Sequence, residues 1–328
     1  MAEVILHHYE LSPFGTAMRL ALGHKGLSWK SVEAPMVSPK PDLSVLTGGY
    51  ERIPVLQVGA DIYCDTIAIA TVLESLKPEP SLYPGPTGQA AAMIALWSGN
   101  SWFIPSVLTG LSGDPNMLPD EFWEDRSVRF GLTKDGFLAG IPHLKAQFAA
   151  GARMLAAALE DGRDFVCGDA AGHADFVLYM NMNFAALSGV QASDYGARLG
   201  AWFERVAAIG FGDREDWTAE QAIQHAAESD PGGGGSVASG SGCEQGQAVG
   251  VGLDAPDPAT KQSTLESQDQ TQMTVTRQNP QARDVHMHIP RKGQTQAPPS
   301  RAARAASRIR GITSTQPQGP RCRPSRAA

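Results

Sequence analysis

Two short segments near the amino terminus place polar side chains where helices are expected to begin. Ser12-Pro13 follows a short apolar run, and Asp65-Thr66 precedes apolar residues at helical spacing. The start of a helix offers backbone N–H groups and the positive end of the dipole. Ser12 could therefore stabilise an anion such as a thiolate, and Asp65-Thr66 could hold a carboxylate. Ordinary helix capping, which needs no ligand, is the alternative interpretation of both pairs.

A third segment, Arg52-Ile53-Pro54-Val55-Leu56, combines a proline with the start of an expected strand. A cis bond before Pro54 would turn the main-chain N–H and C=O of Ile53 outward, where they could pair with an extended peptide. A trans proline that opens an edge strand is the alternative, because the sequence alone does not identify the isomer.

These segments need a sheet and helices to position them. Apolar runs and turn residues predict a first strand, a helix that ends at Gly26, a second strand, a hairpin and a further helix, at residues 4–7, 12–26, 27–32, 53–64 and 65–76. The order β-α-β followed by β-β-α favours a mixed sheet with helices packed on it. We therefore expect a first domain at residues 1–82 and a linker at 83–88.

The strand pattern disappears after the linker, and apolar residues recur at helical spacing. We expect an all-helical domain at residues 89–229, with helices at about 88–109, 119–131, 141–161, 174–188, 193–209 and 218–228. A Gly/Ser linker at 230–242 follows, then a small β-rich module at 243–292 and a disordered basic tail at 293–328.

Charge is divided unevenly along the chain. Residues 1–230 carry 15 Lys/Arg and 28 Asp/Glu, whereas residues 231–328 carry 12 and 6. The acidic first part argues against nucleic acid as a partner, and no long apolar run indicates a membrane segment. The four cysteines, Cys64, Cys167, Cys243 and Cys322, have no paired spacing. This predicts reduced thiols, no metal site and a cytoplasmic location.

Four features in the first 80 residues resemble the amino-terminal domain of soluble, bacterial-like glutathione S-transferases. They are Ser12-Pro13-Phe14, Arg19, Arg52-Ile53-Pro54-Val55-Leu56 and Asp65-Thr66, in that order. The resemblance implies a thioredoxin-like α/β domain followed by an all-α domain. It also implies glutathione as co-substrate, with Phe14, Arg52, Ile53, Pro54, Asp65 and Thr66 as the binding residues.

The same resemblance implies a catalytic role for Ser12, whose hydroxyl would favour the glutathione thiolate, with Tyr9 as the second candidate. The implied activity is conjugation of glutathione to a small, apolar electrophile in detoxification by a homodimer. A non-catalytic glutathione-binding or interaction scaffold is one alternative, and a glutathione-dependent isomerase or dehalogenase is another.

Other candidate residues have structural explanations. His7 and His8 are adjacent in a strand, so they point to opposite faces and cannot act jointly. Gly172 stands where the family has a Ser or Thr cap before Asp175, so the helix start there is expected to be weaker. An aromatic group could in part line an acceptor pocket, although packing is expected for most members: Trp97, Trp102, Phe103, Phe122, Trp123 and Phe130.

Overall fold

The computed structural model describes residues 3–114, 116–231 and 249–250. Its sheet has the order β5-β2-β1-β3-β4-β6. The strands are β1 (Val4–His8), β2 (Ser28–Glu33), β3 (Val55–Val58), β4 (Asp61–Cys64), β5 (Asp213–Trp217) and β6 (Val249–Gly250). β2 lies parallel to both β1 and β5, whereas the β1–β3, β3–β4 and β4–β6 pairs are antiparallel.

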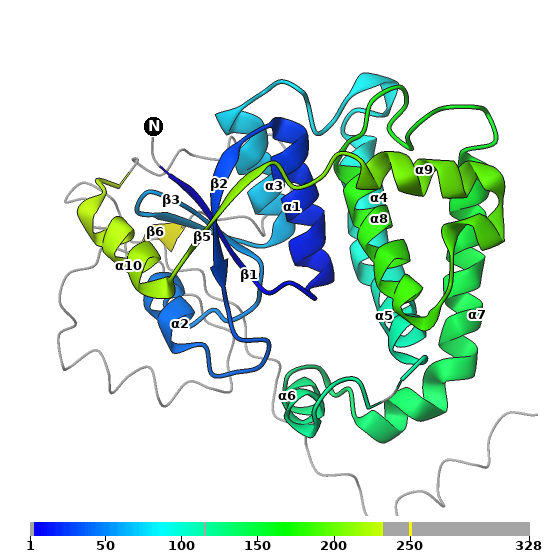
Figure 1. Ribbon diagram of the computed structural model, residues 1–328, viewed down its shortest axis with the longest axis horizontal. Coiled ribbons are helices and arrows are strands. Elements are labelled where there is room, and N and C mark those ends of the chain that lie inside the picture. The colour runs from blue at the N-terminus through cyan, green and yellow to red at the C-terminus, as the bar shows by residue number, and fades with distance from the viewer. Residues whose placement is uncertain (1–2, 115, 232–248, 251–328) are drawn as a thin grey trace, which may run out of the picture. The chain divides into compact units, whose positions relative to one another are not determined.

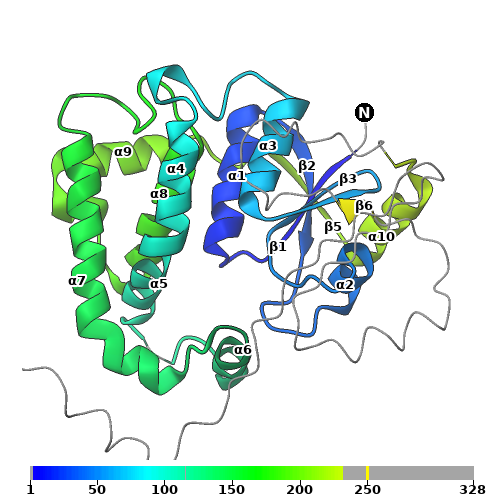
Figure 2. The same cartoon turned by 180° about the vertical axis from the view of Figure 1, so that it is seen from behind.

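Helices cover both faces of this sheet. Figure 1 and Figure 2 show α1 (Pro13–Lys25) and α3 (Thr66–Leu76) on one side, with α2 (Pro41–Thr47) and α10 (Ala219–Glu228) on the other. Alternation along β1 explains this: Leu6 belongs to the core that includes α1 and α3, whereas Ile5 packs against Ala222 of α10. The mixed sheet and its helices confirm the predicted thioredoxin-like domain.

The second part is built from helices around a buried centre. Its helices are α4 (Ala90–Trp97), α5 (Phe103–Leu111), α6 (Asp120–Phe130), α7 (Lys134–Ala158), α8 (His173–Ala185) and α9 (Ala197–Ala207). Short 3-10 turns and a π turn at Ser98–Trp102 connect some of them. α8 is buried along almost its whole length and packs on α1, so one hydrophobic core continues from the helical part to the sheet. This confirms the predicted helical domain.

β5 corrects the sequence analysis, which expected no strand between residues 89 and 228. Its sequence, DREDW, is charged and mostly exposed, so it lacks the apolar alternation by which strands are recognised. Backbone pairing with the edge of β2 forms the strand instead, supported by an ion pair between Lys30 and Glu215. Charged side chains also suit an edge strand, because they discourage pairing with a further chain.

The helix predicted at 218–228 exists as α10, but it lies on the sheet and not in the helical part. Its buried side, Ala222 and Ala226, contacts apolar residues of the strands and of α2. Helical periodicity identifies an apolar face without identifying the surface that the face will cover. The helical domain, expected at residues 89–229, therefore does not include α10.

α7 begins at Lys134, seven residues before the predicted start. The Thr133 hydroxyl caps it by accepting a hydrogen bond from the backbone N–H of Gly136 at 3.1 Å. Pro142 lies inside the helix. The predicted start at residue 141 lies next to this proline, a residue that is more common at the beginning of a helix than in its interior.

Gly172 allows two parts of the fold to approach closely. A Cβ atom there would lie 2.7 Å from the carbonyl oxygen of Leu82 and 2.8 Å from the Sγ of Cys167. Because Gly172 has no side chain, the segment around Leu82 that connects the two domains can pass close to the start of α8. The other half of the expected capping pair is present, since the backbone N–H of Gly172 donates to Asp175 at 3.1 Å.

Most of the expected carboxy-terminal features lie outside the described residues. These are nearly all of the linker at 230–242, the tail at 293–328 and the β-rich module at 243–292 except the pair Val249–Gly250. Within the described part of the chain, no helix combines the length and apolar character needed to cross a membrane.

Candidate functional site

The sheet register gathers the three candidate segments at one end of the strands. His7 of β1 pairs with Val55 of β3, and Val55 pairs in turn with Cys64 of β4. The loop that follows β1, the residues that precede β3 and the residues that follow β4 therefore leave the sheet at the same end. Ser12, Pro54 and Asp65 lie in these three segments.

Ser12 caps α1. Its Oγ accepts a hydrogen bond from the backbone N–H of Gly15 at 3.1 Å, and Pro13 occupies the first helical position. The first turn of α1 contains no acidic residue, so no local carboxylate opposes the positive end of its dipole. The capping role is thus real, and the same geometry places a hydroxyl at a helix start that favours a negative charge.

Tyr9 lies in the loop that precedes Ser12. Burial raises the pKa of its phenol, while the nearby positive charge of Arg126 opposes that rise. The phenol is therefore protonated near neutral pH and can donate a hydrogen bond. The backbone N–H of Ser12 donates to the backbone carbonyl of Tyr9 at 3.0 Å, so both candidates for a thiolate partner lie in one tight loop.

The peptide bond between Ile53 and Pro54 is cis, which decides between the two isomers that the sequence left open. Pro54 is buried, whereas Ile53 is half-buried and Arg52 is exposed. The guanidinium of Arg52 lies 5.6 Å from the ring centroid of Phe130 on α6. A helix of the second domain therefore borders this segment.

Asp65 caps α3, with its Oδ1 accepting the backbone N–H of Ile67 at 2.9 Å. Its φ of 79° makes it the one residue other than glycine with a positive φ among the described residues. Such a conformation costs about 1–3 kcal/mol and is found frequently at functional sites. Asp65 is exposed and Thr66 is half-buried, so both are accessible at the helix start.

Sequence reasoning missed a polar network that fastens α6 to the sheet domain. The backbone N–H of Ser38 donates to Asp125 at 3.0 Å, and Arg129 forms ion pairs with both Asp125 and Glu51. Hydrogen bonds from Ser38 and Lys40 hold the pKa of Glu51 below its usual value although burial acts in the opposite direction. These residues carry no local motif, because they meet only when the two domains pack.

Arg19, which we left out of the predicted site, is 4% exposed and pairs with Glu10 in the Ser12 loop. Its Nη2 also donates to the backbone carbonyl of Glu10 at 2.9 Å and to Thr16 at 3.0 Å. A guanidinium this deeply buried is not a solvated surface charge. Arg19 instead connects α1 to the loop in front of it.

The two histidines of β1 are structural, as predicted. His7 hydrogen-bonds Gln57 at 2.9 Å, and His8 hydrogen-bonds Ser31 at 3.0 Å. Burial lowers the pKa of each to about 4, so both imidazoles are neutral near pH 7. They point to opposite faces of the sheet and form no joint site.

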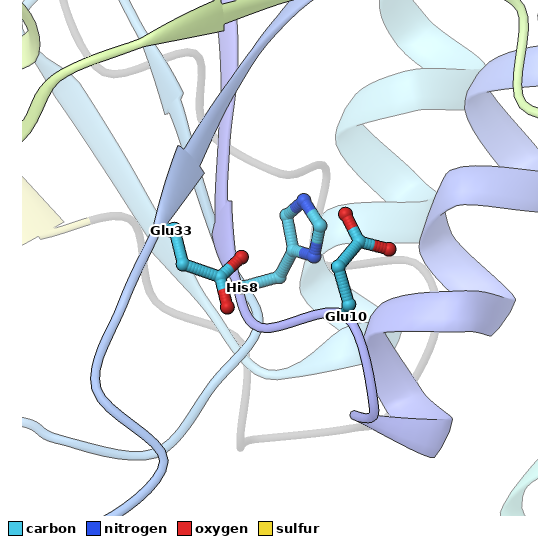
Figure 3. Close-up of side chains that lie close together, drawn as sticks. All are labelled: His8, Glu10 and Glu33. Carbon is cyan, nitrogen blue, oxygen red and sulfur yellow. The ribbon is translucent and has the colours of Figure 1, made fainter.

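Figure 3 shows His8 between the carboxylates of Glu10 and Glu33, with possible ligand atoms within 4.8 Å of one another. Such a group can hold a metal ion in principle. Here, however, both carboxylate oxygens of Glu10 pair with arginines, one with Arg19 and the other with Arg214. The His8 side chain is also fully buried, so an ion would have to displace existing partners.

The aromatic group mostly packs inside the helical domain, as expected. Trp102, Phe122 and Trp123 are buried, whereas Trp97 and Phe130 are exposed. Phe103 is half-buried and lies 4.7 Å from Phe14, measured between ring centroids. Phe14 and Phe103 thus meet where α1 approaches the helical domain.

A shallow, open cavity of about 520 Å³ lies beside the Ser12 loop. Its lining comes from that loop and from the segment after β2, namely Tyr9, Glu10, Leu11, Glu33, Ala34, Pro35 and Met36. Of the predicted residues, only Tyr9 belongs to this lining. The cavity could accept a partly apolar molecule next to the loop.

The described cysteines are buried free thiols. Burial raises the pKa of Cys64 to about 12, and it also raises the pKa of Cys167. Both groups are therefore protonated near neutral pH and are poor nucleophiles. Cys243 and Cys322 lie outside the described residues.

Comparison with known proteins supplies independent information. Residues 6–81 match the family model described as glutathione S-transferase, N-terminal domain. A GST-like protein from Pseudomonas syringae is 34% identical, with a TM-score of 0.57, over 70% of this chain and 76% of that protein.

A glutathione S-transferase from Rhodospirillum rubrum F11 is 21% identical, with a TM-score of 0.50, over 62% of this chain and 88% of that protein. At that identity the similarity shows the fold alone. No curated protein matches the chain.

Proposed function

The chain belongs to the glutathione S-transferase family, and from this premise we propose that it conjugates glutathione to a small, apolar electrophile. One observation carries the proposal: the Ser12 helix start, the cis Pro54 segment and the Asp65 helix start leave the same end of the sheet. These are the three features that a γ-glutamyl tripeptide with an ionised thiol requires.

In the proposed complex, the main chain of Ile53 pairs with the cysteinyl backbone of glutathione. The start of α3, with Asp65 and Thr66, receives the γ-glutamyl end, where the backbone N–H groups suit its carboxylate and Asp65 suits its ammonium group. Phe14, Arg52 and Pro54 complete the contacts in this proposal.

Ser12 donates a hydrogen bond to the glutathione sulfur, and the start of α1 adds its positive dipole. Both favour the thiolate, whose proton passes to solvent. The thiolate then attacks an electrophilic carbon, forming a C–S bond while the leaving group departs with its electron pair. The cavity beside Tyr9 and Met36 is our candidate for the electrophile.

Calorimetry with glutathione and conjugation of chlorodinitrobenzene test this proposal. We expect Ser12→Ala to lower turnover by about 10²-fold, the low end for a positioned polar group. Thr133→Ala is the matched control, because it removes the same kind of cap from α7 away from the site. Tyr9→Phe decides between the two hydroxyls.

If Ser12→Ala keeps full turnover and Tyr9→Phe loses it, Tyr9 replaces Ser12 as the thiolate partner. If glutathione binds with no conjugating activity on any electrophile, the scaffold alternative gains support. Isomerase or dehalogenase activity with the same binding residues would favour the third interpretation.

We further propose that the protein is a cytoplasmic homodimer. The two described cysteines are free thiols, which suits a reducing compartment. On α4, the side chains of Met93, Leu96 and Trp97 are exposed at i, i+3 and i+4 spacing. Such an apolar stripe on one helix face is suited to a second copy of the chain.

A further inference from the structure

Glu10 connects the Ser12 loop to two arginines from distant parts of the chain. One carboxylate oxygen pairs with Arg19 of α1, and the other accepts from the Nη1 of Arg214 at 2.5 Å. Arg214 belongs to β5 and lies 204 positions after Glu10 in the sequence. The loop in front of the α1 helix start is thus held from one side by α1 and from the other by β5.

The segment that brings Arg214 to this loop is itself closely packed. A Cβ atom on Gly23 of α1 would lie 2.2 Å from the carbonyl oxygen of Gly210, so only glycine permits the crossing. The indole of Trp29 donates to the carbonyl of Phe211 at 2.7 Å, and the Phe211 ring lies 4.6 Å from the Arg19 guanidinium. Arg214 therefore approaches Glu10 from a fixed backbone.

Arg214 also has a second anchor, which limits its orientation. Its Nε donates to Asp216 at 2.7 Å while its Nη1 is bound to Glu10. A guanidinium can satisfy both acceptors because its donors are fixed in one plane. The Arg214 side chain is 29% exposed and the Glu10 side chain is 54% exposed, so solvent weakens the ion pair, and its role here is geometric.

We propose that Arg214 is a positioning residue of the glutathione site: it holds Glu10 and thereby fixes the loop that presents Tyr9 and Ser12. Ser12 lies two residues after Glu10, and its backbone carbonyl accepts from Thr16, which Arg19 also contacts. A displaced Glu10 would therefore change the direction of the Ser12 hydroxyl. The inference rests on the proposed function.

The carboxylate of Glu33 lies close to that of Glu10, which gives a reason for two arginines beside Glu10. Figure 3 shows the Glu33 carboxylate near His8 on the side opposite to Glu10. Burial raises the pKa of Glu33 and a hydrogen bond from the Glu10 backbone lowers it; the charge of the Glu10 carboxylate raises it again, while Arg214 and Arg19 lower it. Without Arg214, Glu10 would keep one arginine and would be repelled by Glu33.

Three variants test the proposal: Arg214→Gln, Glu10→Gln and the control Lys30→Gln. The control removes the ion pair between Lys30 of β2 and Glu215 of β5, which holds the residue next to Arg214 without contacting the Ser12 loop. The readouts are kcat/KM with chlorodinitrobenzene and the pKa of bound glutathione, followed by the ultraviolet absorbance of its thiolate.

We expect Arg214→Gln and Glu10→Gln each to lower kcat/KM about tenfold, since small displacements of reacting groups reduce rates strongly. Both should raise the pKa of the bound thiol, because each releases the same loop. A purely long-range charge effect would shift that pKa in opposite directions, because one variant removes a cation and the other an anion. The double variant should be no worse than the single ones.

Opposite pKa shifts, or an equal loss in Lys30→Gln, would overturn the positioning role, as would unchanged kinetics in Arg214→Gln. A wild-type protein that binds glutathione without any thiolate signal overturns the proposed function, and this inference with it. A normal wild-type signal that Arg214→Gln leaves unaltered overturns the inference alone.

Discussion

Arg129 of α6 forms an ion pair with Glu51, which lies 78 positions earlier and three residues before the cis proline. The two residues join the helical domain to the segment proposed to bind the glutathione main chain. Both side chains are partly buried, so solvent screens the pair less than it screens a fully exposed pair. α6 is thereby placed against the site by contacts that no single sequence segment contains.

The first prediction concerns this ion pair. We expect Glu51→Gln to raise the KM for glutathione about tenfold, because removing one partner of a partly buried pair releases α6 from the Pro54 segment. Steady-state kinetics with varied glutathione measure it. Lys134→Gln is the control, since it breaks the exposed pair with Asp120 beside the same helix. Equal KM values in both variants would contradict the role of α6.

The second prediction separates the charge of Asp65 from its capping role. Asp65→Asn retains an oxygen that can accept from Ile67, and Asn tolerates a positive φ. We therefore expect unchanged stability and an affinity for glutathione lowered by about tenfold, because the ammonium group loses its anion. Calorimetry and thermal unfolding measure the two effects.

Asp65→Ala provides the comparison. It loses the charge and the cap together, so its free energy of unfolding should fall by about 1 kcal/mol relative to the Asn variant. If Asp65→Asn binds glutathione as tightly as wild type, the carboxylate has only a capping role.

The third prediction concerns pH and stability. Burial lowers the pKa of His7, His8 and His173 to about 4 from the ordinary value of 6.5. The unfolded chain therefore binds protons between these values while the folded chain does not, so the stabilisation is complete above pH 6.5 and is lost as the pH falls toward 4. Each histidine adds a slope of about 1.4 kcal/mol per pH unit.

Urea unfolding at several pH values between 7 and 4.5 measures this slope. His7→Gln should reduce the slope by the contribution of one histidine, because Gln can still donate to Gln57 but does not titrate. A slope that the substitution leaves unchanged would show that His7 titrates normally in the folded chain.

The fourth prediction concerns the exposed apolar stripe of α4. Met93→Asp places a charge in the proposed dimer contact and should weaken self-association at least tenfold. Val128→Asp is the control, because Val128 is 88% exposed on α6 and lies outside the stripe. Sedimentation equilibrium measures the association. A wild-type monomer, or equal weakening by both variants, would contradict the assignment.

Local signals explain why much of the fold was predictable. Helix starts depend on a few neighbouring residues, and Ser12, Asp65 and Thr133 all cap helices in the structure. Periodicity likewise identified β1 to β4 and the helical segments that correspond to α4 to α10. α7 shows the limit of such signals. The predicted start at residue 141 lies beside Pro142, whereas the helix begins at Lys134.

The sequence by itself determined the order of the elements from β1 to α3, the caps of α1 and α3 and the residues that resemble a glutathione site, because these features depend on short-range interactions. Only the tertiary structure decided that β5 joins the first sheet, that Arg214 holds Glu10, and that α6 is fastened beside Pro54. Those contacts join residues many positions apart, and charged segments such as DREDW form strands only when an existing edge pairs with them.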